Sequence, residues 1–139
     1  MKQTFNQSQC FRVPDKLYGI LSTELSKVTA PPSDSLGITL NFRDAGYSAE
    51  TGGYHPVEIR IVKHNSQWQF DYITDFSFQG CPYPELVKEI DICYQSGQVY
   101  SLYGGKLNKQ DGDELIELFL NNFICYVETG VFSVSVTFN

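Results

Sequence analysis

Two stretches near the middle of the chain alternate apolar and polar residues, and this alternation constrains the fold more than any other feature. The apolar members are Val57, Ile59 and Ile61 in the first stretch and Phe70 and Tyr72 in the second. Successive side chains of a strand point to opposite faces, so a period of two predicts two strands that share one apolar face. Asn65-Ser66 lies between them and suits a two-residue turn, which predicts a hairpin.

Both faces of this hairpin support one register. Its expected cross-strand pairs are Ile61 with Phe70, Ile59 with Tyr72, and Arg60 with Asp71. The first two pairs bring apolar side chains together, and the third brings opposite charges together on the other face. A slip of one residue would reverse both faces, so the pattern favours this register over its neighbours.

Further helices and strands are predicted around the hairpin. The expected helices cover residues 15–29, with Asp15 as N-cap, and residues 111–129, with Asp111 as N-cap and Gly130 beyond the end. Alternation predicts strands over residues 36–42 and 132–138 and a second hairpin over residues 86–103 around Ser96-Gly97. We therefore expect one α+β domain over residues 1–139. It should contain a twisted antiparallel sheet of about six strands, with an N-terminal and a C-terminal helix packed on one face.

Charge narrows the choice of partners. Ten basic residues stand against sixteen acidic ones, which gives a net charge of −6. Binding to nucleic acid or to anionic lipid needs clustered lysines and arginines, so we expect neither nucleic-acid nor membrane binding. A protein partner of such a chain should be basic.

The cysteines and the N-terminal residues bear on the cellular compartment. Cys10, Cys81, Cys93 and Cys125 have no zinc-type spacing. No apolar run is long enough for a signal peptide or a transmembrane segment. We expect a cytoplasmic protein with reduced, largely buried thiols, although export by another route stays open.

Residue types that carry catalysis show no recognisable arrangement in the sequence. His55 and His64 should lie at the two ends of one strand, too far apart to share a ligand, and both are expected at the surface. Cys93 has no basic residue close in sequence to activate it. We therefore expect no catalytic residue, no cofactor and no metal, and a binding protein is favoured over an enzyme without settling the question.

The second face of the predicted sheet carries the candidate binding residues. The acids placed there by alternation are Glu58, Asp71, Asp75, Glu89 and Asp91, which form a candidate site for a basic partner. The apolar candidates for self-association are Val87, Cys93, Tyr100 and Leu102. The alternative is that scattered apolar side chains and solubilising acids occupy an ordinary surface.

Two functions are compatible with these residues. The first is a protein–protein interaction module that self-associates as a homo-oligomer. The second is a small enzyme or small-ligand-binding protein with a pocket between the helices and the sheet. A buried ionisable pair in a cleft favours the second, whereas a large flat apolar and acidic face favours the first.

Four segments resemble a known family. They are NFRDAGYSAETGGYHPVEIRI, YITDFSFQGCPYPELVKEIDICY, VYSLYGG and ELIELFLNNF. They resemble a gamma-proteobacterial family of domains of unknown function, which has no assigned catalytic residues. The fold of that family is similar to that of the mitochondrial acidic matrix protein family, also described as a receptor for the globular heads of the first complement component. The resemblance implies a twisted antiparallel sheet with helices on one face and binding of partners. This chain is shorter and is predicted to have a strand after its last helix, so the oligomer geometry does not carry over.

Overall fold

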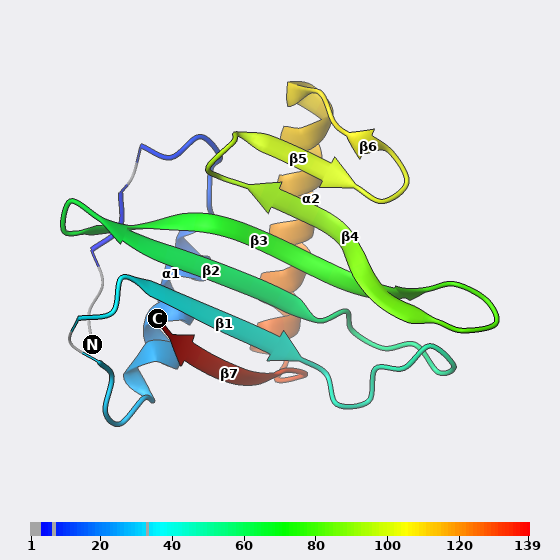
Figure 1. Ribbon diagram of the computed structural model, residues 1–139, viewed down its shortest axis with the longest axis horizontal. Helices are drawn as coiled ribbons and strands as arrows, with labels where there is room; N and C mark the ends of the chain where they lie inside the picture. Colours follow the sequence, from blue (N-terminus) through cyan, green and yellow to red (C-terminus); the bar gives the residue numbers. More distant parts are fainter. Residues whose placement is uncertain (1–3, 7, 33) are drawn as a thin grey trace.

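The computed structural model describes residues 4–6, 8–32 and 34–139 and has an α+β fold, as expected. Two helices accompany one open antiparallel sheet of seven strands (Figure 1). The helices are α1 (Asp15–Ser26) and α2 (Lys109–Glu128). The strands are β1 (Gly37–Arg43), β2 (Val57–His64), β3 (Gln67–Gln79), β4 (Glu85–Cys93), β5 (Gln98–Ser101), β6 (Gly105–Lys106) and β7 (Ser133–Phe138). The additional strand is the short β6.

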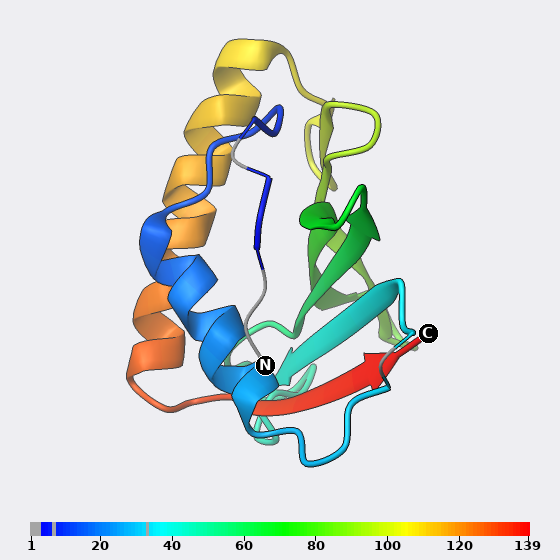
Figure 2. The ribbon, with the colours of Figure 1, turned by 90° about the vertical axis from the view of Figure 1, so that its left-hand side faces the viewer.

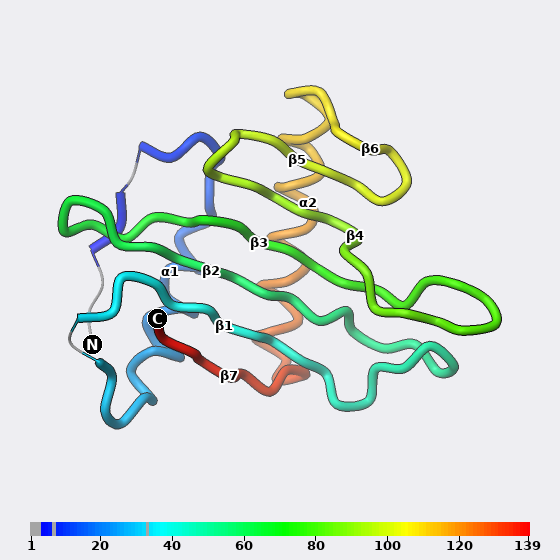
Figure 3. The backbone as a smooth tube through the Cα atoms, viewed as in Figure 1, coloured from blue at the N-terminus to red at the C-terminus, as the bar shows by residue number. Residues whose placement is uncertain are grey.

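The strand order is β6-β5-β4-β3-β2-β1-β7, so the first six strands form a meander. The chain then runs through α2 and returns to the opposite edge, where β7 pairs with β1 (Figure 3). Figure 2 shows α1 and α2 on the same side of the sheet. Within the described residues, neither helix has the length and apolar character that a membrane span requires.

The core lies between the helices and the facing side of the sheet. Leu17, Leu21 and Leu25 of α1 have no exposed surface, because they lie on one helical stripe. Both helices begin at residues other than those expected. Pro14, not Asp15, is the residue before α1, and Asn108 is the N-cap of α2, where its side chain accepts a hydrogen bond from the backbone N–H of Asp111.

The first hairpin has the predicted turn. Asn65 and Ser66 both have positive φ, of 51° and 64°, as a two-residue turn of this hand requires. Ile61 pairs with Phe70, as expected, and both side chains are buried.

A bulge after Phe70 makes the rest of the predicted register wrong. Ile59 pairs with Ile73 rather than with Tyr72, and Tyr72 instead pairs with Arg60. Asp71 is the extra residue, and it reverses the faces that the following residues occupy. Ile73 is therefore buried under the helices, and Tyr72 lies on the outer face of the sheet, away from the helices.

A second irregularity lies between β3 and β4. Asp75 pairs with Ile90, but the next residue, Phe76, pairs with Lys88, so Glu89 is the extra residue. Asp75 is 4% exposed, on the helix side of the sheet. The second hairpin forms around Gly97, with Ile92 opposite Val99. Tyr103, which follows β5, is 78% exposed.

Candidate functional site

A cleft of about 420 Å³ lies between α2 and the sheet. Most of its lining is apolar or aromatic, and the main contributors are Tyr54, Val57, Leu115, Leu118, Phe119, Tyr126 and Phe132. Three ionisable side chains, His55, Asp75 and Glu89, also line it. We call these three residues the cluster. Ionisable groups gathered in an apolar cleft are typical of functional sites.

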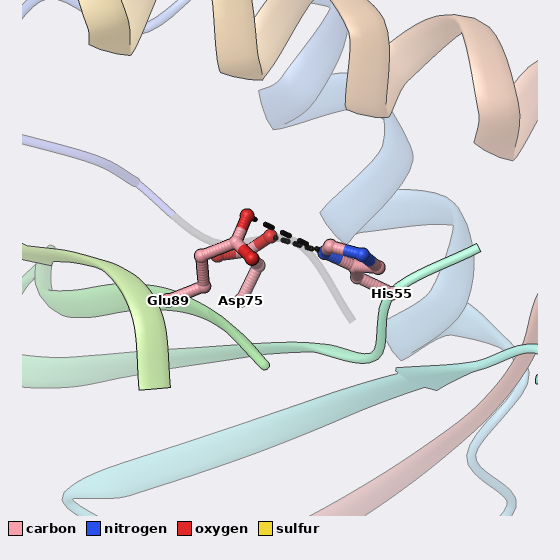
Figure 4. A group of neighbouring side chains, drawn as sticks. All are labelled: His55, Asp75 and Glu89. Atoms are coloured by element: carbon pink, nitrogen blue, oxygen red, sulfur yellow. Dashed lines mark hydrogen bonds and ion pairs between the residues drawn. The ribbon is translucent and has the colours of Figure 1, made fainter. Parts of the chain in front are cut away.

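The cluster joins residues that are far apart in the sequence. The Nδ1 atom of His55 lies 3.1 Å from Oδ2 of Asp75 and 3.7 Å from Oε2 of Glu89 (Figure 4). Asp75 reaches this position from β3 and Glu89 from the bulge in β4. The backbone N–H of Ile90 donates to Oδ1 of Asp75 at 2.7 Å, which fixes the carboxylate.

His55 is positioned by the loop that precedes β2. Asp44 accepts hydrogen bonds from the backbone N–H groups of Gly46 and Tyr54, at 2.9 and 3.0 Å. These two donors lower the pKa of Asp44. Tyr47 stacks on Phe78 with ring centroids 5.2 Å apart and lies 5.4 Å from the ring of His55. The loop therefore holds the imidazole against β3 rather than leaving it free.

The carboxylates change the charge state of His55. The hydrogen bond with Asp75 raises the pKa of His55, partial burial opposes this shift, and the charges of Asp75 and Glu89 add to it. Two carboxylates face one imidazole, so the cluster keeps a negative charge even when His55 is protonated. One donor atom from each of the three residues lies within 4.8 Å of the other two. Such a site can bind a cation.

His55 was expected at the surface, and the structure shows it half-buried and next to two carboxylates. Its side chain is 36% exposed and that of Asp75 is 6% exposed. The sequence correctly placed His55 just before a strand, because Pro56 ends the loop and Val57 begins β2. The link to Asp75 depends on pairing between β2 and β3, which places Val57 opposite Asp75.

The five acids predicted to share the second face do not share it. Asp75 and Glu89 lie in the cleft, whereas Glu58, Asp71 and Asp91 belong to the outer face. Each of the latter three has a partner. Glu58 accepts a hydrogen bond from the hydroxyl of Tyr72, and Asp71 pairs with Arg60 at 3.3 Å, as predicted.

Asp91 also has partners within the chain, although the residue opposite it on β5 is not basic. It accepts a hydrogen bond of 2.6 Å from Thr74 and lies 3.8 Å from the amine of Lys88. Tyr100 is its cross-strand partner. The acidic surface on the outer face is therefore smaller, and more fully paired, than the sequence predicts.

The apolar candidates are divided in a similar way. Tyr100 is 42% exposed, whereas Val87, Cys93 and Leu102 are half-buried. The bulge at Glu89 puts Val87 out of phase with Cys93, so these two residues do not point to the same side.

The thiols are less buried than expected. Those of Cys10, Cys81 and Cys125 belong to exposed residues, and all four cysteines are free.

A second, larger cleft of about 780 Å³ lies between the N-terminal segment and α2. Charged side chains of both signs line it, including Arg12, Asp15 and Lys109. Lys109 is already paired with Asp113, at 2.7 Å. This cleft lacks the converging arrangement of the cluster, so the smaller cleft is the candidate site.

Fold and site together define a small α+β domain with two helices on one side of an antiparallel sheet and an ionisable cluster in the cleft between α2 and the sheet. The chain belongs to the family described as protein of unknown function (DUF2787), whose model matches residues 15–137. This confirms the family resemblance of its sequence. No match was found among curated proteins.

Two solved structures from Vibrio cholerae are similar to this chain. One is the hypothetical protein VC0508 from the VSP-II pathogenicity island, with 34% identity and a TM-score of 0.90 over 99% of this chain and 100% of that chain. The other is the conserved hypothetical protein VC1805 from pathogenicity island VPI-2, with 34% identity and a TM-score of 0.80 over 93% of this chain and 97% of that chain. VC1805 is described as sharing structural homology with the human P32 protein.

Proposed function

We propose that the protein binds a small, positively charged ligand in the cleft between α2 and the sheet. The observation that carries this proposal is the cluster, which lies in a cleft otherwise lined mainly by apolar and aromatic side chains. Small-ligand sites typically have volumes of about 300–1,000 Å³ and place a few polar groups in an apolar lining. The cleft, at about 420 Å³, lies within that range.

The negative charge of the cluster determines the sign of the charge that a ligand should carry. Asp75 and Glu89 outnumber His55, so a positive group is attracted and a carboxylate is repelled. Tyr54 and Tyr126 also line the cleft, with ring centroids 4.7 Å apart, and aromatic faces attract cations. A ligand with a positive end and an apolar body would contact both parts of the lining.

Nuclear magnetic resonance tests this function directly. Alkylammonium and arylammonium compounds are titrated into isotopically labelled protein, with carboxylates of the same shape as controls. We expect only the ammonium compounds to shift backbone amide signals, and the shifted signals to come from residues around the cleft. Equal shifts with the carboxylates, or shifts scattered over the surface, would contradict the proposal.

Two leucines provide a matched pair of variants. Leu118 lines the cleft and is 61% exposed, and Leu36 is 66% exposed and is not part of the lining. We expect both to tolerate serine without loss of core packing, because both side chains are largely exposed. Leu118→Ser should weaken binding of the apolar body, and Leu36→Ser should leave it unchanged.

A second candidate function is self-association and protein binding through the outer face of the sheet. Tyr100 supports it, since a 42% exposed tyrosine beside Asp91 offers both apolar area and charge to a basic partner. Tyr100→Lys should then dissociate a homo-oligomer while leaving the fold intact. Light scattering that shows only monomer for the parent protein at high micromolar concentration would remove this candidate.

A further inference from the structure

We propose that the positive charge taken by the cluster is a divalent first-row transition-metal ion, bound by His55, Asp75 and Glu89, with zinc as the simplest candidate. This inference rests on the proposed function, because the ion would occupy the cluster in place of a ligand's positive group. It depends on the three side chains alone and not on the apolar lining.

The distances between donor atoms suit a single small ion. Nδ1 of His55 is 3.1 Å from Oδ2 of Asp75 and 3.7 Å from Oε2 of Glu89. Ligands that lie about 2.0–2.1 Å from a tetrahedral zinc ion are separated from one another by about 3.3 Å. The two distances lie on either side of this value, so small side-chain movements bring the atoms around one ion.

The donor types favour a transition metal over calcium or magnesium. An imidazole nitrogen suits zinc, copper, iron and nickel, whereas calcium and magnesium prefer sites made of oxygen ligands alone. Three protein ligands also leave a coordination position open, as in zinc sites that accept a further ligand. That position would be available to a molecule in the cleft.

Surrounding groups hold the ligands in place. The backbone N–H of Ile90 engages Oδ1 of Asp75, which leaves Oδ2 for the ion. The ring of Tyr47 lies 5.4 Å from that of His55. Groups that orient ligands in this way strengthen metal binding. A divalent ion would also cancel the charges of the two carboxylates, and His55 would then bind as a neutral ligand.

Calorimetry with zinc chloride, on protein freed of metal with a chelator, tests the inference. We expect one zinc ion per chain at the cluster. Removing a direct ligand by His55→Gln or Glu89→Gln should weaken the affinity by at least the roughly 10–100-fold that loss of an outer-shell partner costs. Matched controls are His64→Gln, which changes the exposed histidine of the turn, and Asp91→Asn, which changes an acid of the outer face. Both should leave zinc affinity unchanged.

Exposed thiols require a second probe, because Cys10, Cys81 and Cys125 can bind zinc. Manganese(II) prefers oxygen and nitrogen ligands and broadens nuclear magnetic resonance signals near its site. We expect broadening of signals from residues flanking His55, Asp75 and Glu89, and its loss in Glu89→Gln. Glu89 is partly exposed, so this variant keeps the fold even if His55→Gln does not.

The results separate this inference from the proposed function. Zinc affinity that is unchanged in both His55→Gln and Glu89→Gln, or manganese broadening away from the cluster, overturns the metal site. If ammonium compounds still bind in the cleft, the proposed function survives and only the metal assignment fails. If neither metal nor ammonium compounds bind there, both proposals are wrong.

Discussion

Replacing Asp75 tests whether its carboxylate supports the irregular pairing of β3 with β4. The side chain is 6% exposed and accepts two hydrogen bonds, from the backbone N–H of Ile90 at 2.7 Å and from Nδ1 of His55 at 3.1 Å. Asp75→Ala removes both acceptors. Asp75→Asn keeps an oxygen that can accept from Ile90, but it removes the charge and replaces the second carboxylate oxygen with an amide donor.

The expected magnitude follows from these contacts. An N–H left without its acceptor inside a protein costs about 1–3 kcal/mol. The bond to His55 adds less than a buried charged bond would, because His55 is 36% exposed and solvent screens it. We therefore expect Asp75→Ala to lower the free energy of unfolding by about 2–4 kcal/mol and Asp75→Asn by about 1 kcal/mol.

Urea unfolding of metal-free protein, followed by circular dichroism, measures both values. Asp91→Ala is the matched control, since its carboxylate accepts from a threonine hydroxyl and not from the backbone. It should cost about 1–3 kcal/mol, because the hydroxyl of Thr74, which is 1% exposed, loses its acceptor. If Asp75→Ala is no more destabilising than Asp75→Asn, the carboxylate does not support the bulge and this reasoning is wrong.

Three further predictions follow from the same structure. Ile61→Ala should lower the free energy of unfolding by about 2–5 kcal/mol in urea titrations, because its side chain has no exposed surface. Tyr94→Phe should be neutral or stabilising by about 1 kcal/mol in the same assay, since no partner for the buried hydroxyl is found among the described residues. The pKa of His55 is raised in the folded state, so its contribution to stability is present at low pH and is lost as pH rises through that pKa. Metal-free protein should therefore lose stability as pH rises above the ordinary pKa of histidine, about 6.5, and His55→Gln should reduce that loss.

Local pattern was sufficient for most of the fold. Alternation located the first hairpin, and the turn at Asn65 and Ser66 was predicted from residue type. The short strand β6 was missed because Gly105 and Lys106 show no alternation and are indistinguishable from a turn in the sequence. The starts of both helices were misplaced because Asp15 and Asp111 are residues of a type common at N-caps. The residues that precede the helices are instead Pro14 and Asn108.

The bulges could not be predicted from the pattern. After Phe70, aromatic residues continue to alternate at Tyr72, Phe76 and Phe78, so an uninterrupted strand is the simplest interpretation of the sequence. The structure instead buries Ile73. Its apolar side chain, directly after Tyr72, was the available signal. An inserted residue reverses the faces of all residues beyond it. Because the bulge was not predicted, Asp75 was expected on the outer face instead of in the cleft.

The composition of the cluster favours the proposed binding site over a purely structural ion pair. A carboxylate buried as deeply as Asp75 needs compensation, and the N–H of Ile90 with a protonated His55 provides it. Glu89 is not needed for that purpose. Its carboxylate adds a second negative charge 3.7 Å from the same imidazole nitrogen, which leaves the cluster with more negative than positive charge. A purely structural pair would be more stable without this surplus, because like charges near one another are unfavourable. A bound cation would neutralise the surplus, and this is the physical reason for locating the binding site at the cluster rather than on the outer face, where each of the predicted acids is already paired within the chain.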